Sequence, residues 1–330
     1  MRKLLLTIVA SVLLLTVVGC SSETDNTKTP AQDSVNLGVI QIVEHPSLDA
    51  AREGFMDALN DHGYVADENL VVDYHNAQGD QGNLQTIARK LVEDQNDLIL
   101  AVATPSAVAM ANETSELPIL ITAVTDPVSA KLVKSKDKPE TNITGTTDMN
   151  PVKDQLKLIK DLVPGAKKVG IIYNSSEINS QIQVDIADQS APELGLELVK
   201  VTVTASSEVM QAAQSLVGRV DAIYLPTDNM VISSVSAVIK VAEDNDIPII
   251  AGESESVEKG ALATVGIDYY QLGRTTGEMA VRVINGEKPH DMAIQSQQGS
   301  DLTINLKAAE RMGVNIPEDL KNKAKKLIKE

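Results

Sequence analysis

Short apolar runs alternate with amphipathic stretches from Asn36 onward. The runs are rich in Ile, Val and Leu and are bounded by polar residues, which is typical of buried strands in a parallel sheet. Between the first two runs, Leu48, Ala51 and Phe55 recur at helical spacing. The alternation predicts βαβ units. The strands expected in the first half are 37–43, 70–75, 97–103 and 118–124.

The second half of the chain repeats this order. Glu116-Leu117-Pro118-Ile119, at the start of the fourth run, is mirrored by Asp246-Ile247-Pro248-Ile249. The repeat predicts an α/β fold of two doubly wound, Rossmann-like lobes, each with an open parallel sheet and right-handed crossovers. The strands expected in the second half are 168–173, 196–203, 221–225 and 248–252.

The chain continues beyond what a second lobe requires. Another apolar run, 261–267, is followed by Asp268, whose side chain can cap a helix that reaches Asn285-Gly286. An extended stretch at 301–306, a helix at 307–312 and a basic tail complete the pattern.

The N-terminus has the pattern of an export signal. Arg2 and Lys3 precede the uncharged residues 4–18, which are too few for a membrane span of ~20 residues. Gly19-Cys20 after this run resembles the bacterial lipobox, in which the cysteine is lipidated and begins the mature chain. The alternative is an ordinary secretory signal that contains Cys20 by chance. Residues 21–35 are almost without apolar side chains and predict a flexible tether.

Composition narrows the classes of partner. The formal net charge of −17 disfavours nucleic acid and anionic membrane surfaces as electrostatic partners. Trp is absent and Phe55 is the only Phe, so the core is expected to be aliphatic. Cys20 is the only cysteine, so no disulfide can form within one chain.

Polar residues follow the predicted strands in both halves. Ligands of open α/β sheets bind where the carboxyl ends of the strands meet helix N-termini. Each such residue can also act simply as a helix cap, which contributes ~1 kcal/mol. Together they predict a cleft lined from both lobes by Glu44-His45-Pro46-Ser47, Thr104-Pro105-Ser106, Thr125-Asp126-Pro127, Asn174-Ser175-Ser176, Pro226-Thr227-Asp228-Asn229 and Gly252-Glu253-Ser254.

Thr104-Pro105-Ser106 is the most informative of these segments. Proline suits the first helical turn and leaves the following amides and two hydroxyls available to a carboxylate. An acid across the cleft, Asp228 or Glu253, could hold an ammonium group. A site that binds a carboxylate on one side and an ammonium group on the other suits an amino acid zwitterion.

Motifs for chemistry are missing from the sequence. The four histidines, His45 among them, are scattered, and neither G-x-S-x-G, GxGxxG nor GxxxxGK[ST] occurs. We therefore expect no catalytic residue, metal or cofactor.

Several sequence segments, taken in order, resemble those of the lipid-anchored substrate-binding proteins of bacterial ABC importers. The branch they resemble is the type I periplasmic-binding-protein-like one that binds tryptophan, phenylalanine or tyrosine. The resemblance covers nearly all of the chain after the tether. The segments that show the resemblance are 38–46, 74–80, 103–106, 123–128, 142–146, 170–174, 226–229 and 266–270.

The resemblance implies three crossings between the lobes, near 145–150, 266–268 and 292–300. The N-terminal lobe would then comprise 36–147 and 268–292, and the C-terminal lobe 148–267 and 293–330. By position, Thr104, Ser106 and Thr125 take the ligand carboxylate and Asp228 its ammonium. The other candidate ligand-binding residues are Glu44, Asp126, Tyr173, Asn174, Ser175, Asn229, Glu253 and Asp268.

The function implied is capture of an aromatic amino acid by hinge closure, by a monomer that a lipid on Cys20 holds outside the cell membrane. Its partners would be an ABC permease and ATPase. Two other functions stay open: a receptor for a sugar or other small molecule, and a ligand sensor without transport. Sugar sites usually stack on aromatic rings, which are scarce here.

Overall fold

The structure is a computed structural model, and it describes residues 34–329. The predicted export signal, Cys20 and the tether as far as Asp33 lie outside the described residues. Within residues 34–329 no helix combines the length and the apolar character needed to cross a membrane.

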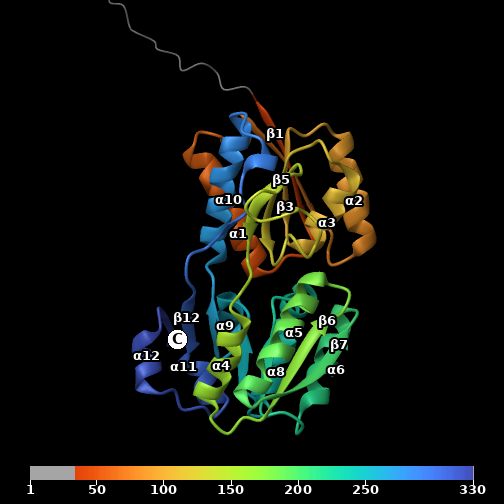
Figure 1. Ribbon diagram of the computed structural model, residues 1–330. Helices are drawn as coiled ribbons and strands as arrows, with labels where there is room; N and C mark the ends of the chain where they lie inside the picture. Colours follow the sequence, from red (N-terminus) through yellow and green to blue (C-terminus); the bar gives the residue numbers. More distant parts are fainter. Residues whose placement is uncertain (1–33, 330) are drawn as a thin grey trace, which may run out of the picture. The chain divides into compact units, whose positions relative to one another are not determined.

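The first of two sheets is parallel throughout (Figure 1). Helices α1 (Pro46–Asp61) and α10 (Tyr269–Ile284) lie on one side of it, and α2 (Gln81–Glu93) and α3 (Thr104–Glu113) on the other. The strand order is β11-β5-β4-β3-β1-β2, with β1 Val35–Gln41, β2 Leu70–Asn76, β3 Leu98–Val102, β4 Ile119–Val124, β5 Ile143–Thr147 and β11 Gln295–Ser296.

The second sheet has the order β13-β12-β10-β9-β8-β6-β7, and β12 runs antiparallel to β10. Its strands are β6 Lys168–Asn174, β7 Glu197–Val203, β8 Ala222–Leu225, β9 Ile249–Ala251, β10 Ala263–Gly266, β12 Asp301–Asn305 and β13 Lys326–Ile328. The helices of this lobe are α4 Val152–Leu162, α5 Ile178–Ser190, α6 Val209–Leu216, α7 Asn229–Ser233, α8 Val235–Glu243, α9 Ser254–Lys259, α11 Leu306–Arg311 and α12 Glu318–Lys323.

The two sheets share one topology. The order β2-β1-β3-β4-β5 in the first lobe equals β7-β6-β8-β9-β10 in the second, so the internal repeat predicted from the sequence is confirmed. In each sheet the order reverses beside the first strand, which opens a crevice at the carboxyl ends of the strands.

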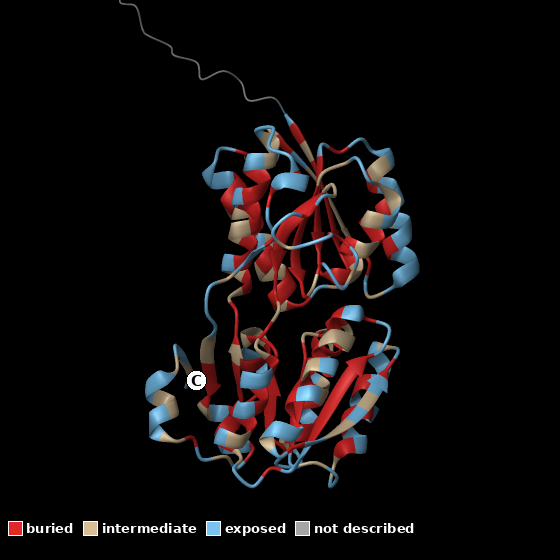
Figure 2. Cartoon of the chain, viewed as in Figure 1, coloured by how far each residue is buried: buried red, intermediate tan, exposed pale blue. Residues whose placement is uncertain are grey.

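Each lobe has its own aliphatic core. Figure 2 shows the buried strands in red between helices whose outer faces are exposed. Ile40 and Leu100 lie in one core, and Ile171 and Ile250 in the other. Residues 34–330 form a single compact unit that contains both cores.

The chain passes between the sheets after β5, after β10 and after β11. Strand β11 pairs with β5, which places the third crossing after Ser296 and corrects the boundary expected at 292–293. Strand β1 begins at Val35, two residues before the strand expected at 37–43, because Val35 pairs with Leu70. Strands β5, β11 and β13 had no expected counterpart, since a Thr- and Gly-rich run, a pair of residues and a basic tail carry little apolar signal.

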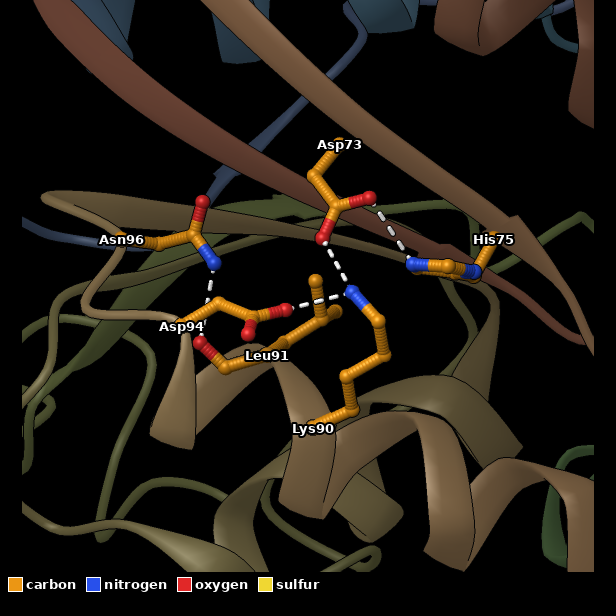
Figure 3. A network of polar contacts seen from close by, with 6 residues as sticks. All are labelled: Asp73, His75, Lys90, Leu91, Asp94 and Asn96. Carbon is orange, nitrogen blue, oxygen red and sulfur yellow. Dashed lines mark hydrogen bonds and ion pairs between the residues drawn. The ribbon is translucent and has the colours of Figure 1, made fainter.

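An exposed ion-pair network joins α2 to the edge strand β2 (Figure 3). Asp73 of β2 accepts from Lys90 of α2 at 2.9 Å and lies 2.8 Å from Nε2 of His75. Lys90 also pairs with Asp94, and Asn96 donates to the Leu91 carbonyl at the end of α2. Although burial raises the pKa of Asp73, Lys90 and His75 leave it lowered. Such charges stabilise little, but they protect a sheet edge from pairing with another strand.

Helices α1 and α10 approach so closely that glycines fill the contact. A Cβ on Gly273 would collide with the carbonyl oxygen of Ala51, and a Cβ on Gly277 would lie 2.6 Å from the Cβ of Ala58. This contact binds a helix from near the start of the chain to one from near its end.

We predict that Gly273→Ala destabilises the protein by about 1–3 kcal/mol, because the added methyl forces the two backbones apart. Helix propensity alone would give the opposite sign, a gain of about 1 kcal/mol. Thermal unfolding of residues 34–330 measures the change. The control is Gly165→Ala, at an exposed site with no atom within 4 Å of the added Cβ. Equal unfolding midpoints for both variants would contradict the proposed role of the contact.

Candidate functional site

Segments at the carboxyl ends of strands in both lobes enclose one small cavity. Most of its lining residues are polar, and their side chains leave room for little more than a water molecule. An amino acid can therefore enter only when the lobes move apart. The lining residues are His45, Ser47, Leu48, Ala123, Thr125, Asp148, Asn179, Thr227, Asn229, Ile232, Glu253 and Tyr269.

Asp148 lies where the chain first leaves the first lobe, directly after β5. Its Oδ2 accepts a 2.7 Å hydrogen bond from the hydroxyl of Tyr269, in the first turn of α10. Its buried Oδ1 has no hydrogen-bond partner among the described residues. Burial raises the pKa of Asp148, more than the nearby hydroxyls of Tyr269 and Thr125 lower it. The cavity therefore contains a carboxyl group that a cation would stabilise in its charged form.

The wall from the first lobe is built on strained backbone. Ala103, between β3 and α3, and Ala123, near the end of β4, have φ of 75° and 55°. Such left-handed conformations cost energy and cluster at binding sites. They precede Thr104 and Thr125, which are joined by a 3.4 Å hydrogen bond from the Thr125 amide to the Thr104 hydroxyl. Ser106 is fully buried, and its hydroxyl has no partner among residues 34–329.

The wall from the second lobe is organised by Glu177. Its carboxylate accepts from the side chains of Asn179 and Asn229, two residues of the cavity lining, and from the Asn229 amide at 3.2 Å. Burial and the neighbouring Asp228 raise the pKa of Glu177 to about 7. Glu177 thus positions two amide side chains toward the cavity without lining it.

Direct contacts join the lobes at the cavity. Ser47, in the first turn of α1, donates to Oε2 of Glu253 at 2.7 Å, and its hydroxyl lies 3.2 Å from Oε2 of Glu255. His45 lies beside Asn229 of the second lobe, and burial lowers the pKa of His45, which keeps the ring neutral. These contacts exist only while the lobes are together.

Asp228, predicted to hold an ammonium group, faces the interior of the second lobe. Its Oδ2 accepts from the Asn174 amide and the Ser180 hydroxyl, both at 2.6 Å, and its Oδ1 caps α7 through the Val231 amide at 2.9 Å. Asp228 does not line the cavity. The ammonium role assigned to it therefore does not fit this geometry, and we assign that role below to Asp148.

The other predicted residues divide by position. Thr125, Asn229 and Glu253 line the cavity, whereas Thr104 lines a more open groove between α3 and the start of α5. The remaining predicted residues lie outside the cavity lining. Ser106 is buried and lines neither the cavity nor the groove. Glu44 accepts a hydrogen bond from Tyr74, Asp126 accepts one from Ser129, and the backbone amide of Asn174 donates to Asp228. Tyr173 is buried at the end of β6, Ser175 is exposed, and Asp268 caps α10.

Sequence reasoning missed Asp148 and Asn179 and gave Tyr269 no polar role. Asp148 follows β5, a strand whose Thr and Gly residues gave no apolar run. Asn179 lies inside a helix rather than before one. The signal available for Asp148 was its place just after the Thr-rich stretch at the expected crossing near 145–150.

No group of three or more His, Cys, Asp or Glu side chains suited to a metal occurs within the described part of the chain. The acids of the cavity lining, Asp148 and Glu253, accept hydrogen bonds from hydroxyls and, for Glu253, from a backbone amide.

Comparison with known proteins shows the family. The profile of the family described as ABC transporter substrate binding protein matches residues 36–328. The chain belongs to this family. Its members work outside the cytoplasm, bind small molecules and deliver them to ABC transporters in the membrane. The lobes, their topology and the cavity between them are those of the type I periplasmic-binding-protein fold.

Individual substrate-binding proteins are similar over most of their length. A tyrosine-binding protein from Clostridioides difficile is 47% identical over 311 residues, which cover 92% of this chain and 90% of the relative. A Streptococcus pneumonia protein in complex with L-Trp is 38% identical with a TM-score of 0.87, over 90% of this chain and all of that structure.

A third structure shows a different arrangement. A substrate-binding protein with adhesive properties from Clostridium difficile, in a ligand-free, open structure, is 45% identical but has a TM-score of only 0.67. It covers 90% of this chain and all of its own. The chain is thus closer in shape to the L-Trp complex than to this more similar sequence in its open form.

We predict that Asp148→Asn raises the thermal unfolding midpoint of ligand-free protein at pH 7.5. Because the folded-state pKa of Asp148 is raised, ionisation costs stability as the pH rises above the value for the unfolded chain. The gain should be on the order of 1 kcal/mol, because an unpaired buried charge costs more than the unpaired neutral amide that replaces it. It should vanish below about pH 3, where the acid is protonated in both states because the unfolded-chain pKa is 3.8.

The matched control for this stability effect is Asp137→Asn, at an exposed position of the same lobe. An Asp148→Asn midpoint below that of the unsubstituted protein at pH 7.5 would show that the carboxyl already has a stabilising partner.

Proposed function

We propose that this chain is the binding component of an ABC importer for an aromatic amino acid, with tyrosine the first candidate. The observation that carries the proposal is the 47% identity to a tyrosine-binding protein across nearly the whole of both chains. The L-Trp complex of a second relative supports the same ligand class. The polar cavity, with its one incompletely paired carboxyl, suits an ammonium group better than a sugar.

The residues of the two cavity walls suggest which part of the ligand each of them binds. The ammonium group pairs with Asp148, which the Tyr269 hydroxyl holds in place at 2.7 Å. The carboxylate is held at the first turn of α3, where the buried Ser106 hydroxyl has a free hydrogen, with Thr104 and Thr125 beside it. The aromatic ring contacts apolar lining from both lobes, Leu48 and Ile232.

Binding works by hinge closure. The lobes are the units that move, with 148–151, 267–268 and 297–300 as the segments between them. Ligand contacts both walls at once only in the closed arrangement, so its binding energy favours that arrangement. The transporter then recognises the closed form. The protein performs no chemistry on its ligand.

Cys20 carries the lipid anchor in this proposal. The sequence 13–20 supports lipidation, and the tether that follows gives the two lobes reach over the membrane. The lipid anchor keeps the protein at the membrane, whereas the two lobes bind the ligand.

Calorimetric titration of residues 34–330 with the amino acids tests the ligand class. We expect saturable heat with tyrosine, tryptophan or phenylalanine. Heat with a sugar or a branched-chain amino acid, and none with the aromatic ones, would overturn the proposal.

Asp148→Asn should weaken binding of the aromatic amino acid by about 100-fold or more, because a buried charge pair loses one partner. The same titration measures it, with Asp137→Asn as the matched control. Full affinity in Asp148→Asn would reject the ammonium contact and leave the ligand class intact.

Cys20→Ala should release the protein from the membrane fraction while residues 34–330 keep their affinity. Cell fractionation followed by titration of the released protein measures both. A variant that stays membrane-bound would contradict the anchor, and one that loses affinity would contradict the division between anchor and lobes.

A further inference from the structure

Two helix N-termini from different lobes meet at a pair of acids. Ser47 lies in the first turn of α1, and Glu253 and Glu255 lie at the start of α9. The Ser47 hydroxyl is within hydrogen-bond distance of both carboxyl groups, at 2.7 Å and 3.2 Å. A hydroxyl has one hydrogen, so it can satisfy only one of them at a time.

Glu253 is the better satisfied acid. It accepts from the Ser256 amide at 3.1 Å and from the Ser256 hydroxyl, besides Ser47. Glu255 is left with the hydroxyls of Ser254 and Ser47, at 3.1 Å and 3.2 Å. Glu253 is buried and Glu255 is partly buried beside it. Ionising both carboxyl groups at once is therefore unfavourable, and the less well satisfied one retains a proton.

The surroundings of the pair do not supply a compensating cation within the cavity. Its lining contains no lysine or arginine. The titratable groups that face the pair are His45 and Asp49 of the first lobe, Asp148 and Tyr269 at the crossings, Glu258 and Lys259 of α9, and Asp268, Asp301, Lys325 and Lys326 across the neighbouring groove. Lys325 and Lys326 are paired with Asp301 and Glu258.

We propose that closing the lobes takes up a proton at the Glu253–Glu255 pair, so that the protein holds its ligand more tightly as the pH falls. The inference concerns regulation of the proposed binding site and rests on that proposal for the identity of the ligand. The proton binds a carboxylate oxygen of Glu255 on closure and returns to solvent on opening.

The direction of the effect follows from burial. In the closed arrangement, burial and the charge of Glu253 raise the pKa of Glu255 to about 9. Burial also raises the pKa of Glu253, but hydrogen bonds from Glu255, Ser256 and Ser47 leave it lowered. Opening removes α1 and Ser47 and exposes Glu255 to water, which lowers its pKa. The closed form therefore binds more protons than the open form between the two pKa values and is disfavoured as the pH rises through that range.

Calorimetric titration of residues 34–330 with tyrosine, or with whichever aromatic amino acid binds, tests the linkage. Titrations in buffers of different ionisation enthalpy at pH 7.5 should show net proton uptake. The Kd should rise about three- to tenfold per pH unit between pH 6 and pH 8.5, where a full proton gives tenfold. Glu255→Gln, which resembles the protonated acid, should abolish both effects. The control Glu258→Gln, an exposed acid of the same helix, should keep them.

A second measurement needs no ligand. The radius of gyration of ligand-free protein, from small-angle X-ray scattering, should increase between pH 6 and pH 8.5 and stay constant in Glu255→Gln. Circular dichroism confirms that each variant is folded.

The outcomes separate the two proposals. Binding without proton uptake or pH dependence, or the same pH dependence in Glu255→Gln, overturns the linkage and leaves the ligand class standing. A pH-dependent radius that Glu255→Gln abolishes, without heat from any aromatic amino acid, supports the linkage and rejects the ligand class.

Discussion

The cleft depends on one electrostatic constraint: it contains buried carboxyl groups and no cationic side chain in its lining. Each acid must be stabilised separately. Glu253, in the lining, accepts several hydrogen bonds from hydroxyls and a backbone amide. Behind the lining, Asp228 does the same, and Glu255 beside Glu253 retains a proton. Asp148 keeps one buried oxygen without a partner. The acid that the protein leaves incompletely paired is the one best suited to bind a ligand cation.

This constraint also connects the site to the hinge. Asp148 is the first residue of the first crossing, and Tyr269 follows the second. The amide of Asp268 donates to the side chain of Gln297, which lies on the third crossing, at 2.8 Å. A cation at Asp148 therefore acts on the segments about which the lobes rotate. Closure and binding involve the same few residues, so little intervening structure is needed to couple them.

The fold was predictable because each apolar run marks a buried strand, and the repetition of the runs marks the second lobe. The strands of both sheets that lie under helices were anticipated within about two residues, which is within ordinary boundary uncertainty. Strand β5 was not predicted because its position between β4 and β11 is fixed by pairing rather than by apolar side chains. The family resemblance indicated the three crossings, which no local pattern contains.

The site was less predictable because one residue type serves two purposes at strand ends. Asp228 and Asp148 both follow a strand, yet one caps α7 and the other has no helix amide to bind. The difference depends on whether a helix starts in register with the carboxyl group, and that is a property of the backbone. Thr125, Asn229 and Glu253 were found because they precede loops or helices directly at the cavity, whereas Asn179 reaches it from within α5.

The packing of α10 on α1 also has a consequence for biogenesis. The first lobe cannot complete its core until α10, more than 200 residues downstream of α1, has been synthesised. Ribosomal synthesis takes some ten seconds or more to cover that distance at about 5–20 residues per second. During that interval the N-terminal half stays without its final partner helix. A chain whose first lobe stays incomplete for that long suits transport across a membrane as an extended polypeptide, since a folded domain would have to be unfolded first.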